Sequence, residues 1–215
     1  MNDFLYTYSE DSYSENGEDG INKKILEHLG ISEGVILEIG AWDGFFASNC
    51  ANLWSKNKNF KGILIESTNR LDLKLEEKFK NINCFVELVS IENTLEKIID
   101  GSKFEVTNEN FVLASIDVDG DDLNVCKSLG KYKPIILIVE PNGNLIEKIN
   151  PEGWTIKELV DWGSDFGYEF IGTSGHVGKH SGNVYLIRED YNDKFDICKK
   201  PWLERGILLP EGIVY

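Results

Sequence analysis

Residues 34–44 of the chain read GVILEIGAWDG, an apolar run that ends in two glycines set around a tryptophan and an aspartate. Four further short apolar runs follow: GILIE at 62–66, CFVELV at 84–89, FVLASIDV at 111–118 and PIILIVE at 134–140. None of them alternates strictly between apolar and polar residues, which is typical of strands that are covered on both faces. We therefore predict a sheet buried between two layers.

Stretches with helical spacing separate these runs. Their apolar residues are Phe46, Cys50, Leu53 and Trp54; Leu71, Leu75 and Phe79; Ile91, Leu95 and Ile98; and Leu123, Cys126 and Leu129. This alternation of strand and helix predicts a mainly parallel sheet with right-handed crossovers. Ligands of such sheets bind at the carboxyl ends of the strands, near the point where the strand order switches.

Further elements are predicted on both sides of this core. An apolar stripe marks a leading helix: Ile21, Ile25, Leu26 and Leu29. Gly30 follows the stripe at the position typical of a residue after a helix C-terminus. Thr155 and Glu158 form the pattern of a capping box at a later helix start. The stretches YEFIGT at 168–173 and NVYLIR at 183–188 predict two final strands.

Length and charge indicate one globular domain that avoids polyanions. The chain has 215 residues, of which 41% are hydrophobic and 27% charged, and a chain of this size buries about 70% of its unfolded surface. Its 22 Lys and Arg against 37 Asp and Glu give a formal net charge of −15, with no basic patch. Nucleic-acid binding relies on cationic side chains that displace counterions from phosphates. We therefore exclude DNA and RNA as partners.

Cysteine usage and hydropathy indicate the compartment. The four cysteines are far apart with no CxxC pair: Cys50, Cys84, Cys126 and Cys198. Each adjoins an apolar run, so we predict buried free thiols. The first residues lack the pattern of a signal peptide, and no run of 18 apolar residues occurs. We expect a cytoplasmic protein that does not enter a membrane.

The end of the first run has the pattern of a nucleoside-binding turn. Glu66 ends the second run, 22 residues after Gly44, which is the spacing of a nucleoside-binding βαβ unit. Gly40 would let the chain turn sharply beside the ligand, Glu38 would accept from a ligand amine, and Glu66 would bind both hydroxyls of a ribose. The alternative is that Gly40 and Gly44 only make a tight turn.

The residue between these glycines helps to choose the cofactor. Trp42 occupies the place where a dinucleotide pyrophosphate needs a central glycine for close backbone approach. S-adenosylmethionine has no phosphate, and its sulfonium and ammonium groups are cationic. A pocket edged by Glu38, Asp43, Glu66 and Asp117 suits those charges better than it suits NAD.

Up to four carboxylates follow the fourth predicted strand, in the run SIDVDGDD: Asp117, Asp119, Asp121 and Asp122. Close carboxylates repel one another unless a cation lies among them, and a substrate cation, the sulfonium and Mg²⁺ are all candidates. Mg²⁺ would take Asp117, Asp119 and Glu140 as ligands. An EF-hand calcium loop is excluded, because its sixth position holds Asp122 instead of Gly. The alternative is that Asp121 or Asp122 only caps the next helix.

Two histidines lie in the glycine-rich stretch that precedes the last predicted strand. His176 and His180 are four residues apart, but the glycines around them disfavour a helix and therefore a zinc pair. His180 remains a candidate base, after Asp117, with a solvated loop histidine as the alternative.

One combination of motifs resembles a known family. The segment YSENGEDGI (13–21) precedes LEIGAWDG, SIDVDGDD and IVEPN, and together they resemble the FkbM-like branch of S-adenosylmethionine-dependent methyltransferases over about residues 13–143. Glu15 and Pro141 depart from that branch, in which Gln and an aromatic residue are common at these positions.

The resemblance implies a fold and a set of site residues. The fold is a Rossmann-like class I methyltransferase, α/β, with a mainly parallel seven-stranded sheet, helices on both faces and a C-terminal antiparallel hairpin. Glu38, Gly40, Ala41 and Gly44 would line the methionine moiety, and Glu66 would bind the ribose. Asn16, Gly17, Glu18 and Asp19 would form a flap near the cofactor, although this segment has the alternative role of capping the leading helix.

The implied activity is methyl transfer from S-adenosylmethionine to a small molecule or glycan. We expect O-methylation of a sugar or glycan hydroxyl, with Asp117 as base and Mg²⁺ as a possible aid. The alternatives are methylation of a non-sugar metabolite and a non-catalytic nucleoside-binding module. One domain would span 1–215: a flap and leading helix (1–33), a cofactor-binding core (34–140), and acceptor loops, last strands and tail (141–215). The oligomeric state stays open, with a homodimer as one option.

Overall fold

The structure is a computed structural model that describes residues 5–141, 151, 153–175 and 182–195, together with the backbone of 208–209 and 212–213. Its main sheet contains β1 (Gly34–Ile39), β2 (Phe60–Glu66), β3 (Ile82–Val86), β4 (Phe111–Ile116), β5 (Ile136–Val139), β6 (Tyr168–Thr173) and β7 (Val184–Arg188). A separate pair is formed by β8 (Leu208–Leu209) and β9 (Gly212–Ile213).

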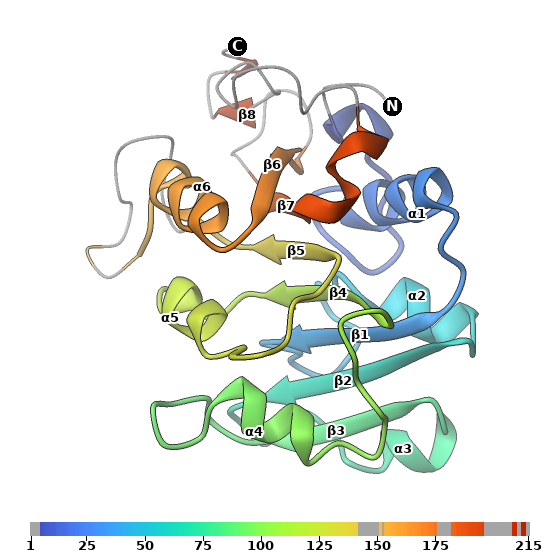
Figure 1. The fold of residues 1–215 in the computed structure, drawn as a ribbon. Helices are drawn as coiled ribbons and strands as arrows, with labels where there is room; N and C mark the ends of the chain where they lie inside the picture. Colours follow the sequence, from blue (N-terminus) through green and yellow to red (C-terminus); the bar gives the residue numbers. More distant parts are fainter. Residues whose placement is uncertain are drawn as a thin grey trace.

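The main sheet has the strand order β3-β2-β1-β4-β5-β7-β6 (Figure 1). Strands β1 to β5 pair in parallel, whereas β7 runs antiparallel to both β5 and β6. From β1 the strand order therefore runs through β2 to β3 at one edge, and from β4 it continues through β5 toward the other edge. The switch in strand order lies between β1 and β4, where ligands of open α/β sheets bind. The predicted parallel sheet and final hairpin are confirmed.

Helices cover both faces of the sheet. They are α1 (Glu18–Leu29), α2 (Ala51–Lys56), α3 (Leu75–Lys78), α4 (Leu95–Asp100), α5 (Asp122–Lys127) and α6 (Ile156–Asp165), with the 3-10 helices η1 (Leu5–Tyr8) and η2 (Glu189–Lys194). One apolar core lies between the sheet and α4, α5 and α6, and a second lies between the sheet and α1 and α2. Figure 1 shows α4 to α6 on the left and α1 to α3 on the right. This explains why the strands are apolar along their whole length.

Local signals set some of the helix ends. Gly30 ends α1 in the left-handed conformation, and Thr155 begins α6 with a complete capping box that includes Glu158. Several apolar residues predicted on helices lie outside them, and two of these are exposed: Phe46 is 59% exposed and Ile91 is 92% exposed. Phe46 falls in a turn because the Asp43 carboxylate accepts from its backbone N–H, and Ile91 precedes α4 because Thr94 caps that helix.

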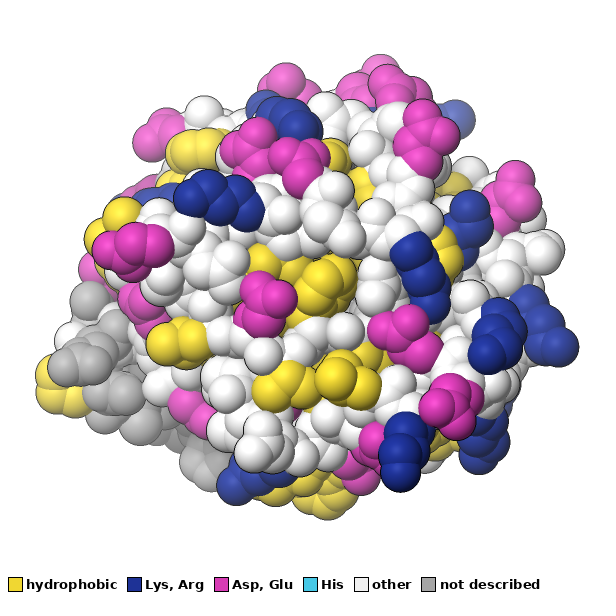
Figure 2. Space-filling view, turned by 90° about the horizontal axis from the view of Figure 1, so that it is seen from below, with side chains coloured by type: hydrophobic (Ala, Val, Ile, Leu, Met, Phe, Trp, Pro, Cys, Tyr) yellow, Lys and Arg dark blue, Asp and Glu magenta, His cyan; other side chains and the backbone are white. Residues whose placement is uncertain are grey.

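Strand β3 forms one margin of the sheet, and a side chain occupies part of its open edge. The Glu76 carboxylate of α3 accepts from the Cys84 backbone N–H at 2.7 Å and from the Asn83 amide at 3.0 Å. Lys103 donates to the same carboxylate at 2.8 Å. Figure 2 shows the molecule from this side, with acidic and basic side chains interspersed among apolar ones.

The described cysteines agree with the expectation of buried free thiols. Cys50, Cys84 and Cys126 are free and buried, and Cys198 lies outside the described residues. Among the helices that the structure describes, none has the length and apolar character needed to cross a bilayer.

Candidate active site

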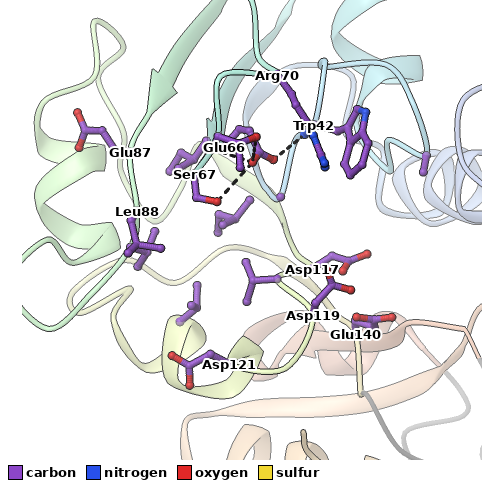
Figure 3. Close-up of a pocket in the computed structure, with 18 of the residues that line it drawn as sticks. Trp42, Glu66, Ser67, Arg70, Glu87, Leu88, Asp117, Asp119, Asp121 and Glu140 are labelled. Carbon is purple, nitrogen blue, oxygen red and sulfur yellow. Dashed lines mark hydrogen bonds between the residues drawn. The ribbon is translucent and has the colours of Figure 1, made fainter. Parts of the chain in front are cut away.

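A cavity of about 560 Å³ opens at the carboxyl ends of the parallel strands, around the switch point (Figure 3). Five of the sequence-predicted site residues line it: Gly40, Glu66, Asp117, Asp119 and Glu140. The lining also includes residues that the sequence analysis did not select: Glu15, Phe46, Ala47, Ser67, Thr68, Arg70, Glu87, Leu88 and Val89. The cavity therefore lies where the topology predicts a ligand.

Gly40 lets the turn after β1 pass against the end of β4. Its φ is +78°, and a Cβ atom on it would lie 1.8 Å from the carbonyl oxygen of Asp117. Its backbone N–H donates to the carbonyl of Ile65 at 3.0 Å. Only glycine fits both the left-handed conformation and the close approach, so Gly40 fixes the floor of the cavity.

Glu66 organises the wall after β2. Its buried carboxylate accepts from the Trp42 backbone N–H at 3.0 Å, and from the backbone N–H and hydroxyl of Thr68 at 2.9 and 2.8 Å. The bond to Trp42 joins Glu66 to a residue with a φ of +49°, which is unusual for a bulky side chain. Backbone strain of this kind clusters at functional sites.

The wall opposite Trp42 follows β3, at Glu87, Leu88 and Val89. Leu88 is 69% exposed, which is high for an apolar residue that lines a cavity. The apolar run 84–89 predicts a strand, and its residue types alone do not mark its end as a binding wall. The available signal was topological, because every parallel strand of this sheet brings its carboxyl end to the same edge.

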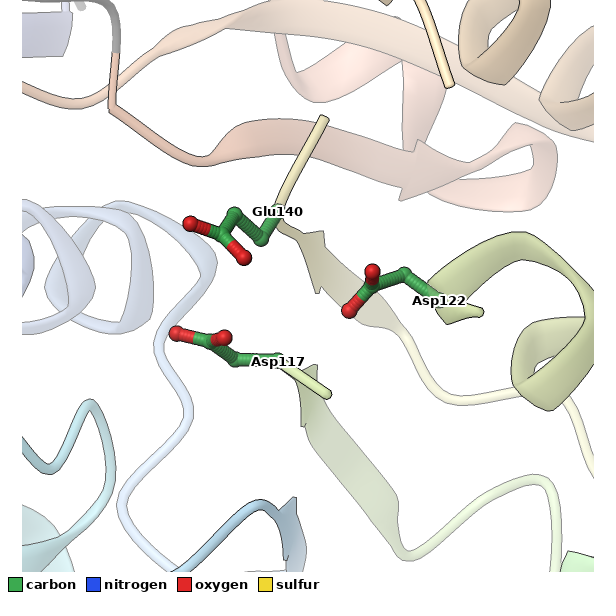
Figure 4. Close-up of side chains that lie close together, drawn as sticks. All are labelled: Asp117, Asp122 and Glu140. Carbon is green, nitrogen blue, oxygen red and sulfur yellow. The ribbon is translucent and has the colours of Figure 1, made fainter. Parts of the chain in front are cut away.

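Three carboxylates lie close together at the edge of the site: Asp117 and Glu140, which line the cavity, and Asp122, which is fully buried (Figure 4). One oxygen from each lies within 4.8 Å of the others. Desolvation, together with the charge of the neighbouring Glu140 and a side-chain hydrogen bond to it, raises the pKa of Asp117 to about 8. Burial raises the pKa of Asp122 to about 6, although its carboxylate accepts from the backbone N–H groups of Val118 and Gly120.

This cluster differs from the predicted metal set of Asp117, Asp119 and Glu140. Asp122 takes the place of Asp119, which lines the cavity at a φ of +59° without joining the group. Of the two residues named as alternative caps of α5, Asp121 stands at the N-cap position but makes no side-chain capping bond, and the Asp122 carboxylate accepts from Val118 and Gly120 instead. Three carboxylate donors are chemically suited to a hard cation such as Mg²⁺.

The raised pKa of Asp117 predicts a pH-dependent stability. The folded protein keeps a proton that the unfolded chain releases above pH 3.8, so stability falls as the pH rises from about 4 to 8. We expect Asp117→Asn to raise the melting temperature at pH 9, by about 2 to 4 °C for each kcal/mol added to the free energy of unfolding. The gain should shrink at pH 5. Thermal melts of both proteins at the two pH values test this, and an equal gain at pH 5 and pH 9 would contradict it.

The remaining residues predicted around the first turn do not line the cavity. Glu38 is buried beneath it, where its carboxylate accepts from the Ser48 hydroxyl at 2.6 Å and the Asn49 backbone N–H at 2.7 Å. Burial raises the pKa of Glu38 to about 7. Ala41 is buried, Asp43 forms a turn with the N–H groups of residues 45 and 46, and Gly44 packs against leucine side chains.

The predicted flap residues hold the N-terminal segment in place. Asp19 accepts from three backbone N–H groups, at residues 12, 13 and 14, and Gly17 stands at the helix start without a side-chain cap. Glu18 is buried, and its carboxylate accepts from the Asn16 N–H and from two groups of the β6–β7 hairpin, Ser174 and Asn183. Burial raises the pKa of Glu18.

From this segment Glu15 alone is among the residues that line the cavity. The Asn16 side chain does not cap α1. None of Asn16, Gly17, Glu18 and Asp19 is among the residues that line the cavity. His180, the second candidate base, lies outside the described residues.

The strand order, the glycine turn after β1 and the acidic residue after β2 are those of a Rossmann-like fold. No family model matches the sequence, and no curated protein matches it. The resemblance to the FkbM-like branch therefore stays a prediction.

Solved structures of methyltransferases are similar to the chain. A selenomethionine-substituted CurJ carbon methyltransferase has a TM-score of 0.52 and 12% identity, over 86% of this chain and 57% of that one. A methyltransferase from Aquifex aeolicus has a TM-score of 0.44 and 16% identity, over 77% and 88%. A precorrin-6y C5,15-methyltransferase from Geobacter metallireducens has a TM-score of 0.45 and 17% identity, over 83% and 90%. The likeness to CurJ confirms the predicted fold.

Proposed function

We propose that the chain is an S-adenosylmethionine-dependent methyltransferase. The observation that carries this proposal is the acidic cavity at the switch point, in which Glu66 follows β2 and Gly40 forms the turn after β1. Seven of the residues that line the cavity are Asp or Glu, which suits a ligand with cationic groups and no phosphate. The bulk of Trp42 in the glycine turn also disfavours a dinucleotide.

The lining residues divide between the parts of this cofactor. Leu88 and Glu87 offer an apolar surface and a carboxylate for the adenine ring and its amine. Glu66 would accept from the ribose hydroxyls. Gly40 would flank the methionine moiety, and Asp117 and Glu140 would face the sulfonium. The cofactor supplies a methyl group that is already activated for transfer, so the protein mainly aligns the acceptor and removes its proton.

Asp117 is the proposed base. With S-adenosylmethionine bound, the methyl group would pass from the cofactor's sulfur to the acceptor oxygen, and the carboxylate of Asp117 would take the proton of that hydroxyl. A base works best when its pKa lies near the working pH, and the pKa of Asp117 is about 8. A divalent cation is a second way to acidify the hydroxyl. Asp117, Asp122 and Glu140 would hold it, because one oxygen of each lies within 4.8 Å of the others.

The proposed acceptor is a hydroxyl of a sugar or glycan. The resemblance to the FkbM-like branch supports this choice. An alcohol also needs a base to remove its proton, and Asp117 is the proposed base. An amine acceptor would need less base strength, and a non-catalytic binding module would need no base at all. Assays of labelled methyl transfer to hydroxylated and amine acceptors distinguish these three functions.

Cofactor binding is the first test of the proposal. We expect S-adenosylhomocysteine to bind the wild-type protein in a calorimetric titration, and NADH not to bind. Glu66→Ala should weaken S-adenosylhomocysteine binding by about 100-fold, because the substitution removes charge-assisted hydrogen bonds to the ribose and the support of the Trp42 turn. Glu169→Ala, in β6 and away from the cavity, is the matched control. Binding of NADH in place of S-adenosylhomocysteine would contradict the proposal.

A further inference from the structure

Arg70 is the one cationic side chain among the described residues that line the cavity. Seven carboxylates share that lining, yet Arg70 forms no ion pair with any described residue. Its guanidinium carbon lies 3.4 Å from the centroid of the Trp42 ring instead. Stacking of this kind occupies the flat face of a guanidinium and leaves the in-plane N–H donors available.

Trp42 is held where it can support Arg70. The bond from its backbone N–H to Glu66 fixes the turn, and its side chain remains 42% exposed. Its ring also contacts Phe46, with the ring centroids 5.8 Å apart. The guanidinium therefore rests on a surface that the turn itself positions, so little side-chain entropy is left to lose when a ligand binds.

The place of Arg70 in the cavity indicates which end of the ligand it meets. In Figure 3, Glu87 and Leu88 lie on one side of Glu66, and Trp42 and Arg70 lie on the other. The ribose is the middle part of S-adenosylmethionine, with adenine on one side and methionine on the other. If Glu66 binds the ribose and Leu88 contacts adenine, the methionine end extends toward Arg70.

We propose that Arg70 binds the carboxylate of the methionine moiety. This inference rests on the proposed function. The charges of the two partners correspond: the cofactor has one carboxylate and two cationic groups, and the cavity has one cation among many carboxylates. A guanidinium that presents two parallel N–H donors matches a carboxylate in geometry as well as in charge.

The test compares S-adenosylmethionine with decarboxylated S-adenosylmethionine, which keeps adenosine, sulfonium and amine and lacks only the carboxylate. We expect the wild-type protein to bind the intact molecule about 10- to 100-fold more tightly, which corresponds to about 1.4 to 2.7 kcal/mol. Arg70→Ala should remove this preference and leave binding of the decarboxylated form unchanged. Arg70→Lys should retain part of the preference, because it keeps the charge and loses the stacked plane.

Each outcome of these titrations is decisive. An equal loss for both ligands in Arg70→Ala would overturn the proposal, since it would make Arg70 a wall of the cavity, and an unchanged preference would overturn it as well. Lys78→Ala removes a positive charge from α3 without touching the cavity, so it controls for long-range electrostatics. If the wild-type protein binds neither ligand, the proposed function fails and not merely the role of Arg70.

Discussion

Asp117→Asn is expected to lower the rate of methyl transfer by about 10²- to 10⁴-fold, the usual contribution of a positioned base. Asparagine has nearly the same size and can still donate to Glu140, but it cannot take a proton. Binding of S-adenosylhomocysteine should persist, because the cavity keeps its shape and Glu66 is unchanged. The measurement is single-turnover transfer of a labelled methyl group, with calorimetric titration of the same protein sample.

The pH profile of the wild-type protein supplies a second readout for the same residue. Asp117 must be deprotonated to act as a base, so the rate should rise with pH through about 8 and then level off. Asp161→Asn, an exposed change on α6, should leave the rate and its profile unaltered. Full activity in Asp117→Asn would remove the proposed base. A rate that vanishes with chelator and returns with Mg²⁺ would favour the metal-assisted alternative.

Gly40→Ala is expected to abolish measurable binding of S-adenosylhomocysteine and to destabilise the fold. The new Cβ would meet the Asp117 carbonyl oxygen at 1.8 Å, in backbone that cannot move without separating β1 from β4. Overpacking and unfavourable φ together should cost about 3 kcal/mol or more. Chemical denaturation and calorimetric titration measure the two effects.

Gly30→Ala is the matched control for this substitution. Gly30 also has a positive φ, of +70°, but no atom lies within 4 Å of the position of its Cβ. The change should therefore cost only about 1 to 2 kcal/mol for the left-handed conformation and leave binding intact. Equal effects of the two substitutions would show that the close approach to Asp117 does not matter.

Sequence patterns predicted the sheet because strands buried on both faces carry a strong apolar signal. All five core strands appear within a few residues of their predicted bounds. Helix extents were less predictable, because apolar residues at helical spacing also occur by chance. Phe46 and Ile91 show this, since a turn at Asp43 and a cap at Thr94 fix the chain around them.

Site residues were predictable where a topological rule connects them to a strand end. Gly40, Glu66 and Asp117 follow β1, β2 and β4, and all three line the cavity. Arg70 has no such rule, because it lies in a loop whose path depends on Trp42 and Glu66.

Glu38 shows a different limit of the sequence. It lies two residues from Ile36, so both side chains point to the same face of the sheet, toward α2 and away from the cavity. The sequence shows a carboxylate near the turn but not the polar groups, on Ser48 and Asn49, that receive it.

The Glu76 carboxylate of α3 lies against the edge strand β3 and limits strand pairing at that edge. The Cys84 N–H already donates to Glu76, so it cannot donate to an added strand. The charged side chain of Glu76 at this edge also disfavours strand pairing with a neighbouring chain. Glu76 therefore occupies, at Cys84, a backbone position of β3 to which an added strand would have to pair.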